Sequence, residues 1–191
     1  MKILFIGDVF GKPGRNAVKT LLPDLRKKRK RDLVIANIEN INHGKGVSLN
    51  KLEEMKKAGV DFFTSGNHIW RDKEIYPYLN KKDTLLLRPL NYLDDAPGHG
   101  DGVAVLKDER KVLIINVSGQ LFMPGIVNDP FRSVEKILIK HGILNKESNP
   151  DTYSKNDNMI GIKKAGYDAV FIDIHGEATG EKLAFGYFMD G

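Results

Sequence analysis

The sequence predicts an α/β protein in which a largely parallel sheet is flanked by helices. Short apolar runs of strand length alternate with longer segments whose apolar residues recur at helical spacing, and the order begins β-α-β-α-β. These apolar runs are nearly continuous, as in strands that are buried on both faces. The length of 191 residues, with 41% hydrophobic and 29% charged residues, fits one soluble domain with a sizeable core. We therefore expect a single domain over residues 1–191.

The expected elements up to Ser65 are, in order, a strand at 2–9, a helix at 15–31, a strand at 33–36, a helix at 49–57 and a strand at 60–65. Pro23 interrupts the pattern of the first helix, which predicts a kink or a later start. Ser48 is the expected N-cap of the second helix, and Gly59 is expected to close it. The first helix is expected to turn these residues toward the core: Ala17, Val18, Leu21, Leu22 and Leu25.

The elements expected after His68 are a short helix at 73–79, a strand at 84–87, paired strands at 102–106 and 111–117, a helix at 132–141, a strand at 169–174 and a helix at 179–189. The paired strands are joined by a turn at 108–110. Residues 145–158 are polar and rich in helix breakers, which predicts a surface loop.

Composition excludes several kinds of site and location. The chain has no cysteine, so disulfides, thiolate metal sites and cysteine nucleophiles are excluded. The apolar run at residues 1–6 breaks at Gly7-Asp8 and is too short for a signal peptide, and no stretch approaches the roughly 18 apolar residues that span a bilayer. We expect a cytoplasmic protein with no membrane partner. The net charge of +5 suits a phosphorylated or polyanionic partner.

Metal-binding side chains follow four of the predicted strands. Because the carboxyl ends of parallel strands lie at one edge of a sheet, side chains that are distant in sequence can meet there. Carboxylate, amide and imidazole groups without sulfur suit manganese, iron or zinc, and two ions about 3.5–4 Å apart can activate water for attack on phosphorus. A neighbouring imidazole can protonate the departing oxygen. The residues are Asp8, Glu39, Asn40, Asn67, His68 and His175, with Glu177 nearby.

Each of these residues also has a structural explanation when it is taken alone. Asp8 can cap the next turn, Glu39 and Asn40 can solvate a strand end, and Asn67 can be a turn former beside a surface His68. His175 can form an internal ion pair. Separate structural explanations would require four coincidences at equivalent strand ends, whereas one shared site explains all of these residues. We therefore favour the metal site. Glu177 is expected to be structural or to orient a ligand.

The remaining histidines and the basic residues have open interpretations. His43 lies in a polar loop, where substrate contact and simple solvation are both open, and His99 is expected in a loop. His141, near a helix C-terminus, is expected to interact favourably with the helix dipole. The basic run at residues 26–31 is expected to be a solvated helix end, with RNA contact as the alternative. Arg15 is a candidate for contact with a substrate phosphate.

Four segments together resemble the calcineurin-like metallophosphoesterases, and more narrowly the bacterial YmdB-like branch of cyclic-nucleotide phosphodiesterases. They are Gly7–Gly11, Asn37–Asn40, Gly66–His68 and Asp173–Thr179, and the segments Arg88–Pro89, Phe122–Pro124 and Asp129–Arg132 fit the same branch. The resemblance implies an α/β sandwich with a dinuclear site that holds two divalent ions, iron or manganese. It also implies that Asp8 and Asn40 bind one ion, that Glu39 bridges both, that Asn67 and His175 bind the other, and that His68 is the proton donor.

The chain departs from the wider superfamily at three places. The superfamily has Asp-x-His where Phe10 follows Asp8, and it has Gly-Asp-x-x-Asp where this chain has Glu39-Asn40; both departures are typical of the YmdB-like branch. Relatives also continue past residue 191 into Gly-Thr-His-Thr-His, whose histidines bind metal. We therefore expect the fold to lack its C-terminal part and the ligand set to be incomplete.

Two functions follow from the resemblance as expectations. The first is a metal-dependent phosphodiesterase that hydrolyses cyclic nucleotides or related small phosphodiesters with a metal-activated hydroxide and His68 as proton donor. The alternative is a truncated, catalytically weak homologue that acts as an RNA-binding or regulatory module. The resemblance also suggests a homo-oligomer.

Overall fold

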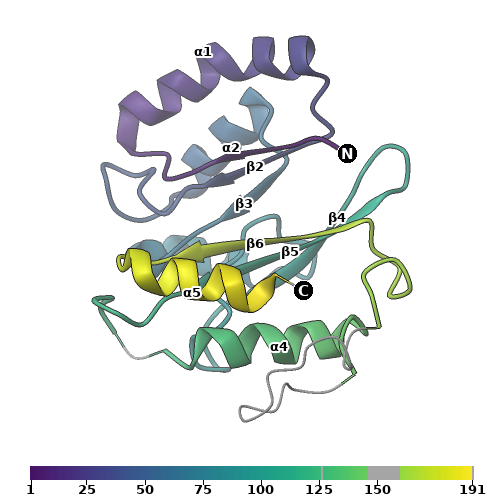
Figure 1. The fold of residues 1–191 in the computed structure, drawn as a ribbon. Helices are drawn as coiled ribbons and strands as arrows, with labels where there is room; N and C mark the ends of the chain where they lie inside the picture. The colour runs from purple at the N-terminus through teal and green to yellow at the C-terminus, as the bar shows by residue number, and fades with distance from the viewer. Residues whose placement is uncertain (126, 146–159, 191) are drawn as a thin grey trace. The chain divides into compact units, whose positions relative to one another are not determined.

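The computed structural model describes residues 1–125, 127–145 and 160–190. The chain divides into two compact units, which are described separately (Figure 1). Unit 1 consists of Met1–Pro89 with Pro97–His99, and unit 2 consists of Leu90–Ala96 with Gly100–Gly191. The single domain over residues 1–191 stays a prediction. The polar loop expected at 145–158 lies outside the described residues, except for Asn145.

Unit 1 contains a parallel sheet in the order β1-β2-β3, formed by β1 (Ile3–Ile6), β2 (Leu33–Asn37) and β3 (Phe62–Thr64). The helices α1 (Gly11–Arg29) and α2 (Leu49–Ala58) connect these strands and contact each other (Figure 1). The predicted β-α-β-α-β order is confirmed. The strand expected at 84–87 is reduced to one parallel bridge between Leu86 and Phe63.

The core of unit 1 lies between the sheet and its two helices. Ala36 of β2 and Phe63 of β3 belong to one buried cluster with Leu22 of α1 and Met55 of α2. Ile35, which points to the opposite face of the sheet, is also buried. The prediction of burial on both faces is therefore confirmed for β2, the central strand, and its carboxyl end is held in place from both sides.

The same prediction is wrong for β1. Phe5 is exposed, and Ile3, Leu4 and Ile6 are only half-buried. The reason is the strand order: β1 has a neighbour on one side only, so less of its surface is covered than that of β2.

The first helix also differs from its prediction. It begins at Gly11 and runs through Pro23 to Arg29, so the later start is wrong. Ala17, Leu21 and Leu25 are exposed, although the apolar spacing placed them in the core. Only a narrow stripe of α1 reaches the short sheet, and the buried residues Val18 and Leu22, one helical turn apart, form it.

The other elements of unit 1 follow their predictions closely. Ser48 directly precedes α2 as expected, but its hydroxyl donates to Oδ1 of Asn50 at 2.7 Å. Gly59 ends α2 in a left-handed conformation with φ of 107°. The short helix expected at 73–79 consists of the 3-10 turn η2 (Lys73–Ile75) followed by α3 (Tyr76–Leu79).

Unit 2 contains a mixed sheet in the order β4-β5-β6, formed by β4 (Asp101–Val105), β5 (Lys111–Ser118) and β6 (Ala169–His175). β4 and β5 are antiparallel, as their turn predicted, whereas β6 is parallel to β5. The helices are α4 (Pro130–Lys140) and α5 (Thr179–Met189). α4 begins two residues before its predicted start because the side chain of Asp129 accepts from Arg132 N at 3.0 Å and caps it.

The core of unit 2 gathers on one face of β5. Ile115 and Val117 of β5 belong to one cluster with Val134 of α4 and Phe185 of α5, so both helices pack on that face (Figure 1). The ring of Phe131 lies 5.4 Å from that of Phe185 and joins the two helices. The predicted α/β class, with sheets flanked by helices, is confirmed. No helix in the described part of the chain is long and apolar enough to cross a bilayer.

Candidate functional site

The loop after β1 is hydrogen bonded to the segment after β2. Val9 N donates to the carbonyl oxygen of Asn37 at 2.9 Å, and Gly11 N donates to that of Asn40 at 3.0 Å. Asp8 lies in this loop with φ of 43°, a left-handed conformation that Asp adopts more readily than most residues. These bonds bring the Asp8 carboxylate to the end of β2.

The end of β2 is joined in turn to the end of β3. Ile38 N donates to the Thr64 carbonyl at 3.0 Å, and Nδ2 of Asn37 donates to the Ser65 carbonyl at 3.1 Å. Oδ1 of Asn37 accepts from Glu39 N at 3.2 Å, which fixes the turn that carries Glu39. Asn37 is a positioning residue of this candidate site, and the sequence analysis did not single it out as one. Its signal was a polar residue at the end of the apolar run of β2.

Four side chains meet where these strands end, and we call them the carboxamide cluster: Asp8, Glu39, Asn40 and His68. Nδ2 of Asn40 donates to Oδ1 of Asp8 at 2.8 Å and to Oε1 of Glu39 at 3.0 Å. Oδ1 of Asn40 lies 2.6 Å from Nδ1 of His68. The structure thus brings together four of the six predicted site residues. Their roles as ligands and proton donor stay predictions.

Glu39 is the buried carboxylate of the cluster, with 2% of its surface exposed. Its Oε2 accepts from the backbone N of His68 at 3.2 Å, and its Oε1 lies 3.3 Å from Nδ1 of the same residue. A buried carboxylate loses its hydration, and hydrogen bonds from nearby donors compensate for that loss. The Glu39 carboxylate is therefore fixed in position by groups from β2 and β3.

The surroundings of His68 decide which of its nitrogens bears hydrogen. Nδ1 faces two oxygen atoms, one from Asn40 and one from Glu39, so it acts as a donor. In the neutral imidazole, Nε2 is then the nitrogen without hydrogen. The side chain is half-buried at the start of the 3-10 turn η1 (Asn67–Trp70), and Asn67 precedes it, also half-buried.

The carboxamide cluster fits a divalent cation on one side. The carboxylates of Asp8 and Glu39 both accept from Nδ2 of Asn40. A cation in the place of this nitrogen would therefore meet oxygens from both carboxylates. A half-turn of the Asn40 amide group would add Oδ1 to this set, and oxygen donors suit hard or borderline ions. Within residues 1–125, 127–145 and 160–190, no three His, Asp or Glu side chains are grouped closely enough to hold a metal by themselves. The carboxamides are therefore needed for such a site.

The last predicted ligand, His175, belongs to unit 2. It ends β6, is half-buried, and pairs in register with Ser118 at the end of β5. Its carbonyl oxygen accepts from Gly119 N at 2.8 Å. Glu177, two residues further on, is exposed. The role of His175 as a ligand stays a prediction.

Glu181 is a second residue that the sequence analysis missed. It lies in the first turn of α5 and is 8% exposed. Its carboxylate accepts from Gln120 N at 2.8 Å and from Leu121 N at 3.2 Å, so it holds the loop that follows β5. An acidic residue in the first turn of a predicted helix was its only sequence signal.

The other candidate residues are placed as follows. His43 and His99 are exposed, and substrate contact by His43 stays a prediction. His141 ends α4, where Nδ1 lies 2.6 Å from the Tyr167 hydroxyl and Nε2 lies 2.8 Å from Oδ2 of Asp101. These bonds join α4 to β4 and to the segment before β6. Burial raises the pKa of the Tyr167 hydroxyl, and the Asp101 charge adds to this effect.

Two basic features have structural roles. Arg15 is buried, and its guanidinium donates to the Ile41 carbonyl at 2.8 Å and to Glu54 at 3.1 Å, so it holds α1 against its neighbours. Arg26, the first residue of the basic run, pairs with Asp61 at 2.9 Å. RNA contact by the rest of the run stays a prediction.

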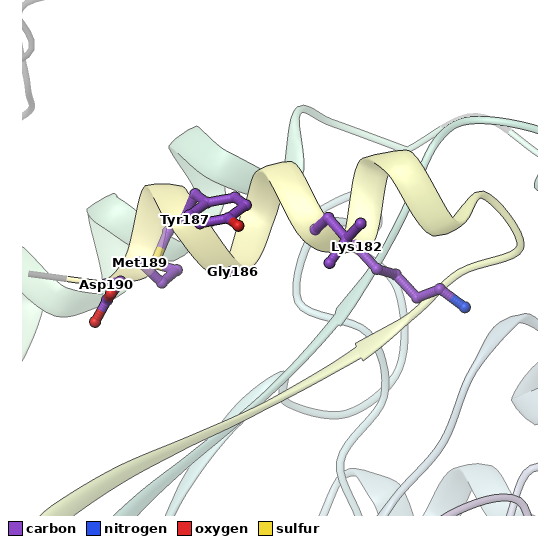
Figure 2. Close-up of a pocket in the computed structure, with 6 residues that line it drawn as sticks. Lys182, Gly186, Tyr187, Met189 and Asp190 are labelled. Atoms are coloured by element: carbon purple, nitrogen blue, oxygen red, sulfur yellow. The ribbon is translucent and has the colours of Figure 1, made fainter.

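A pocket of unit 2 lies along α5. Figure 2 shows that its labelled residues lie along this one helix, from Lys182 to Met189, and at Asp190, which directly follows it. Its lining is mainly apolar, with Leu183, Tyr187 and Met189 among its residues. A mainly apolar surface of this kind is not suited to a metal or a phosphate.

An α/β fold whose strand ends gather carboxylate, carboxamide and imidazole groups is of the metallophosphoesterase kind. A family model described as YmdB-like protein matches residues 4–191, and the chain belongs to this family.

Three relatives illustrate the similarity. The 2',3'-cyclic-nucleotide 2'-phosphodiesterase of Bacillus subtilis (strain 168) is 36% identical over 192 residues, which cover 100% of this chain and 63% of the relative. The structure of a hypothetical protein from Thermus thermophilus matches with a TM-score of 0.79 and 35% identity, over 100% of this chain and 64% of that one. The structure of a novel phosphatase from Mycoplasma pneumoniae matches with a TM-score of 0.78 and 36% identity, over 100% of this chain and 60% of that one. This chain therefore spans less than two thirds of the length of each relative.

Proposed function

We propose that this chain takes part in the metal-dependent hydrolysis of cyclic nucleotides or related small phosphodiesters. The observation that supports this most strongly is the carboxamide cluster, in which two carboxylates and an imidazole from different strand ends share one carboxamide. Metal-dependent phosphodiester hydrolysis uses groups that bind cations next to a group that transfers a proton. The name of the Bacillus subtilis relative supports a cyclic nucleotide as the substrate.

Asp8, Glu39 and Asn40 are the proposed cation ligands of the cluster, with Asn67 beside it and His175 as a further predicted ligand. Two divalent ions, iron or manganese, are the proposed cofactors. When bound, such ions activate water and neutralise the charge that develops on phosphoryl oxygens. Glu39 is the proposed bridging ligand, because its carboxylate is buried and held by hydrogen bonds to both of its oxygens.

His68 is the proposed proton donor. In the proposed step, water adds to phosphorus and gives one proton to solvent while the bond between phosphorus and the leaving oxygen breaks. That oxygen takes a proton from Nε2 of the doubly protonated ring, and solvent then returns a proton to Nε2. Oε1 of Glu39, 3.3 Å from Nδ1, holds Nδ1 in its protonated form and fixes the orientation of the ring when the Asn40 amide turns its oxygen toward a cation. A positioned acid of this kind assists departure of the leaving oxygen.

The proposal is tested by incubating the purified chain with 2',3'-cyclic AMP and following the product by phosphorus NMR. We expect turnover with added manganese or iron and its loss after chelation. Absence of turnover with either metal, at metal concentrations that saturate the protein, contradicts the proposal. Identification of the phosphate position in the product shows which ester bond is cleaved.

A further inference from the structure

Phe10 is an aromatic residue at a position that favours a short polar one. It is the N-cap of α1, with φ of -89° and ψ of 115°, and its side chain forms no capping hydrogen bond. Ser, Thr, Asp or Asn at an N-cap accepts a hydrogen bond from the first turn and stabilises the helix by about 1 kcal/mol relative to an apolar residue. Phe10 is also 57% exposed. Helix capping therefore does not explain a phenylalanine here.

The neighbouring apolar residue already provides the contact with the core. Val9 is 2% exposed and belongs to the buried cluster of unit 1. A Cβ atom on Gly14, in the first turn of α1, would lie 3.2 Å from Cγ1 of Val9, so the helix start packs closely on this side chain. The loop after β1 thus directs Val9 inward and leaves Phe10 at the surface.

The ring of Phe10 is supported by the loop that follows Asn40. A Cβ atom on Gly44 would lie 2.7 Å from Cζ of the Phe10 ring, closer than side chains approach. Gly44 is buried and has φ of 91°, so both its conformation and this contact require glycine. The loop backbone therefore holds the ring from one side, while more than half of the residue stays exposed.

The backbone of Asn40 connects this ring to the carboxamide cluster. Its carbonyl oxygen accepts from Gly11 N at 3.0 Å and from Gly44 N at 3.2 Å. Its side chain belongs to the cluster and donates to Oδ1 of Asp8 at 2.8 Å. Asp8 precedes Phe10 by two residues, so their Cα atoms lie within about 7 Å of each other. All of these residues belong to unit 1.

We propose that Phe10 is a stacking platform for the nucleobase of the substrate. This inference rests on the proposed function and specifies the substrate class as phosphodiesters that carry a base. The phosphate of such a substrate binds at the carboxamide cluster, and its base lies on the exposed side of the neighbouring ring. A phenyl ring has no hydrogen-bonding group, so it contacts the face of any base and contributes affinity without selecting among bases.

The test compares a ligand with a base and one without. Calorimetric titrations in the presence of manganese use adenosine 2'-monophosphate and glycerol phosphate. Phe10→Leu keeps an apolar contact with Gly44 but has no ring, and we expect it to bind the nucleotide about 5- to 100-fold more weakly and glycerol phosphate as the wild type does. Phe10→Tyr keeps the ring and is expected to keep the nucleotide affinity. The matched control is Tyr187→Ala, an aromatic residue that is 79% exposed on α5 (Figure 2).

Four outcomes overturn the inference. The first is an unchanged nucleotide affinity in Phe10→Leu, and the second is an equal weakening of both ligands in this variant. The third is the same loss of nucleotide affinity in Phe10→Tyr or in Tyr187→Ala. The fourth is a wild-type chain that binds the nucleotide no more tightly than glycerol phosphate. Since a variant that fails to fold loses both ligands, the comparison between ligands separates loss of folding from loss of stacking.

A capping variant removes the ring in a different way. Phe10→Ser supplies an N-cap hydroxyl, which offsets the lost contact with Gly44. It is expected to lose nucleotide affinity as Phe10→Leu does, and wild-type nucleotide affinity in Phe10→Ser overturns the inference.

Turnover separates this inference from the proposed function. The substrates are 2',3'-cyclic AMP and glycerol 1,2-cyclic phosphate, and Phe10→Leu is expected to raise KM for the nucleotide alone. If the wild-type chain turns over neither ester with manganese or iron, the proposed function fails, whereas the titrations still decide the role of Phe10.

Discussion

Nδ1 of His68 lies 2.6 Å from Oδ1 of Asn40. This contact joins the end of β3 to the end of β2, and the amide nitrogen of the same Asn40 reaches the carboxylates of Asp8 and Glu39. One carboxamide therefore orients the imidazole on one side and separates two negative charges on the other. It links the residues to which we assign cation binding and proton transfer.

The proton-donor role of His68 predicts a large loss of turnover in His68→Ala. We expect kcat for 2',3'-cyclic AMP to fall by about 10²- to 10⁴-fold, the usual contribution of a positioned acid. The matched control is His99→Ala, since His99 is exposed and lies outside the carboxamide cluster. The measurement is the initial rate at saturating metal. A fall of less than threefold in His68→Ala would exclude this role.

The ligand role of Glu39 predicts that Glu39→Gln loses its response to metal. A ligand that binds only the folded state stabilises it, so the thermal midpoint of the wild type is expected to rise when manganese is added. Glu39→Gln keeps the shape of the side chain but removes its charge, so its midpoint is expected to be insensitive to manganese. Glu177→Gln, an exposed control, is expected to respond as the wild type does. Equal midpoint shifts in all three proteins would contradict the role.

The proposed ligand role of Asn40 predicts how removal of its side chain changes stability with and without manganese. Without metal, its Nδ2 separates the carboxylates of Asp8 and Glu39. In Asn40→Ala this donor is lost, and the free energy of unfolding is expected to fall by about 1–3 kcal/mol because the buried Glu39 carboxylate loses a partner. Manganese is expected to stabilise the wild type more than Asn40→Ala, since the variant lacks one of the proposed cation ligands. Urea denaturation with and without manganese measures both effects, and a manganese stabilisation that is equal in the two proteins would argue against Asn40 as a ligand.

Much of the fold could be predicted from the sequence because its signals are local. The bounds of α5 agree with the prediction, and β2 shows the predicted burial on both faces. The exposure of Phe5 could not be predicted, because it depends on which strand lies at the edge of the sheet. The exposure of Leu21 and Leu25 likewise depends on how little of α1 the sheet covers.

Some residues of the candidate site could likewise be predicted from the sequence, and others could not. Asp8, Glu39 and His68 follow apolar runs, so their position at strand ends could be predicted from the chain alone. Asn37 and Glu181 could not be assigned, because their importance lies in backbone groups that are distant in sequence. A polar residue in an apolar run indicates burial, but only the fold shows which atoms satisfy it.

The contact between Gly46 and Asp72 predicts different costs for two similar substitutions. Gly46 has φ of 83°, and a Cβ atom there would lie 2.6 Å from Oδ2 of Asp72, which also accepts from Asn42. Gly166 has φ of 84°, and nothing lies within 4 Å of its Cβ position. Gly166→Ala is expected to cost about 1–2 kcal/mol from the backbone alone, and Gly46→Ala is expected to cost more. Urea denaturation of both variants checks the order, and equal losses would show that Asp72 moves aside freely.

The pairing of Glu54 with α1 predicts a dependence of stability on pH. A hydrogen bond from Lys19 and the charges of Lys19, Arg15 and Lys51 lower the pKa of Glu54, against an opposing contribution from burial. Because the pKa is lower in the folded state, the stabilisation is complete above the ordinary value of 4.5 and is lost as pH falls through the folded pKa. Glu54→Gln is therefore expected to lose stability at pH 7 and to show a shallower decline between about pH 5 and 3. Unfolding free energies measured across this range test the prediction, and parallel declines in both proteins would assign the acid sensitivity to other carboxylates.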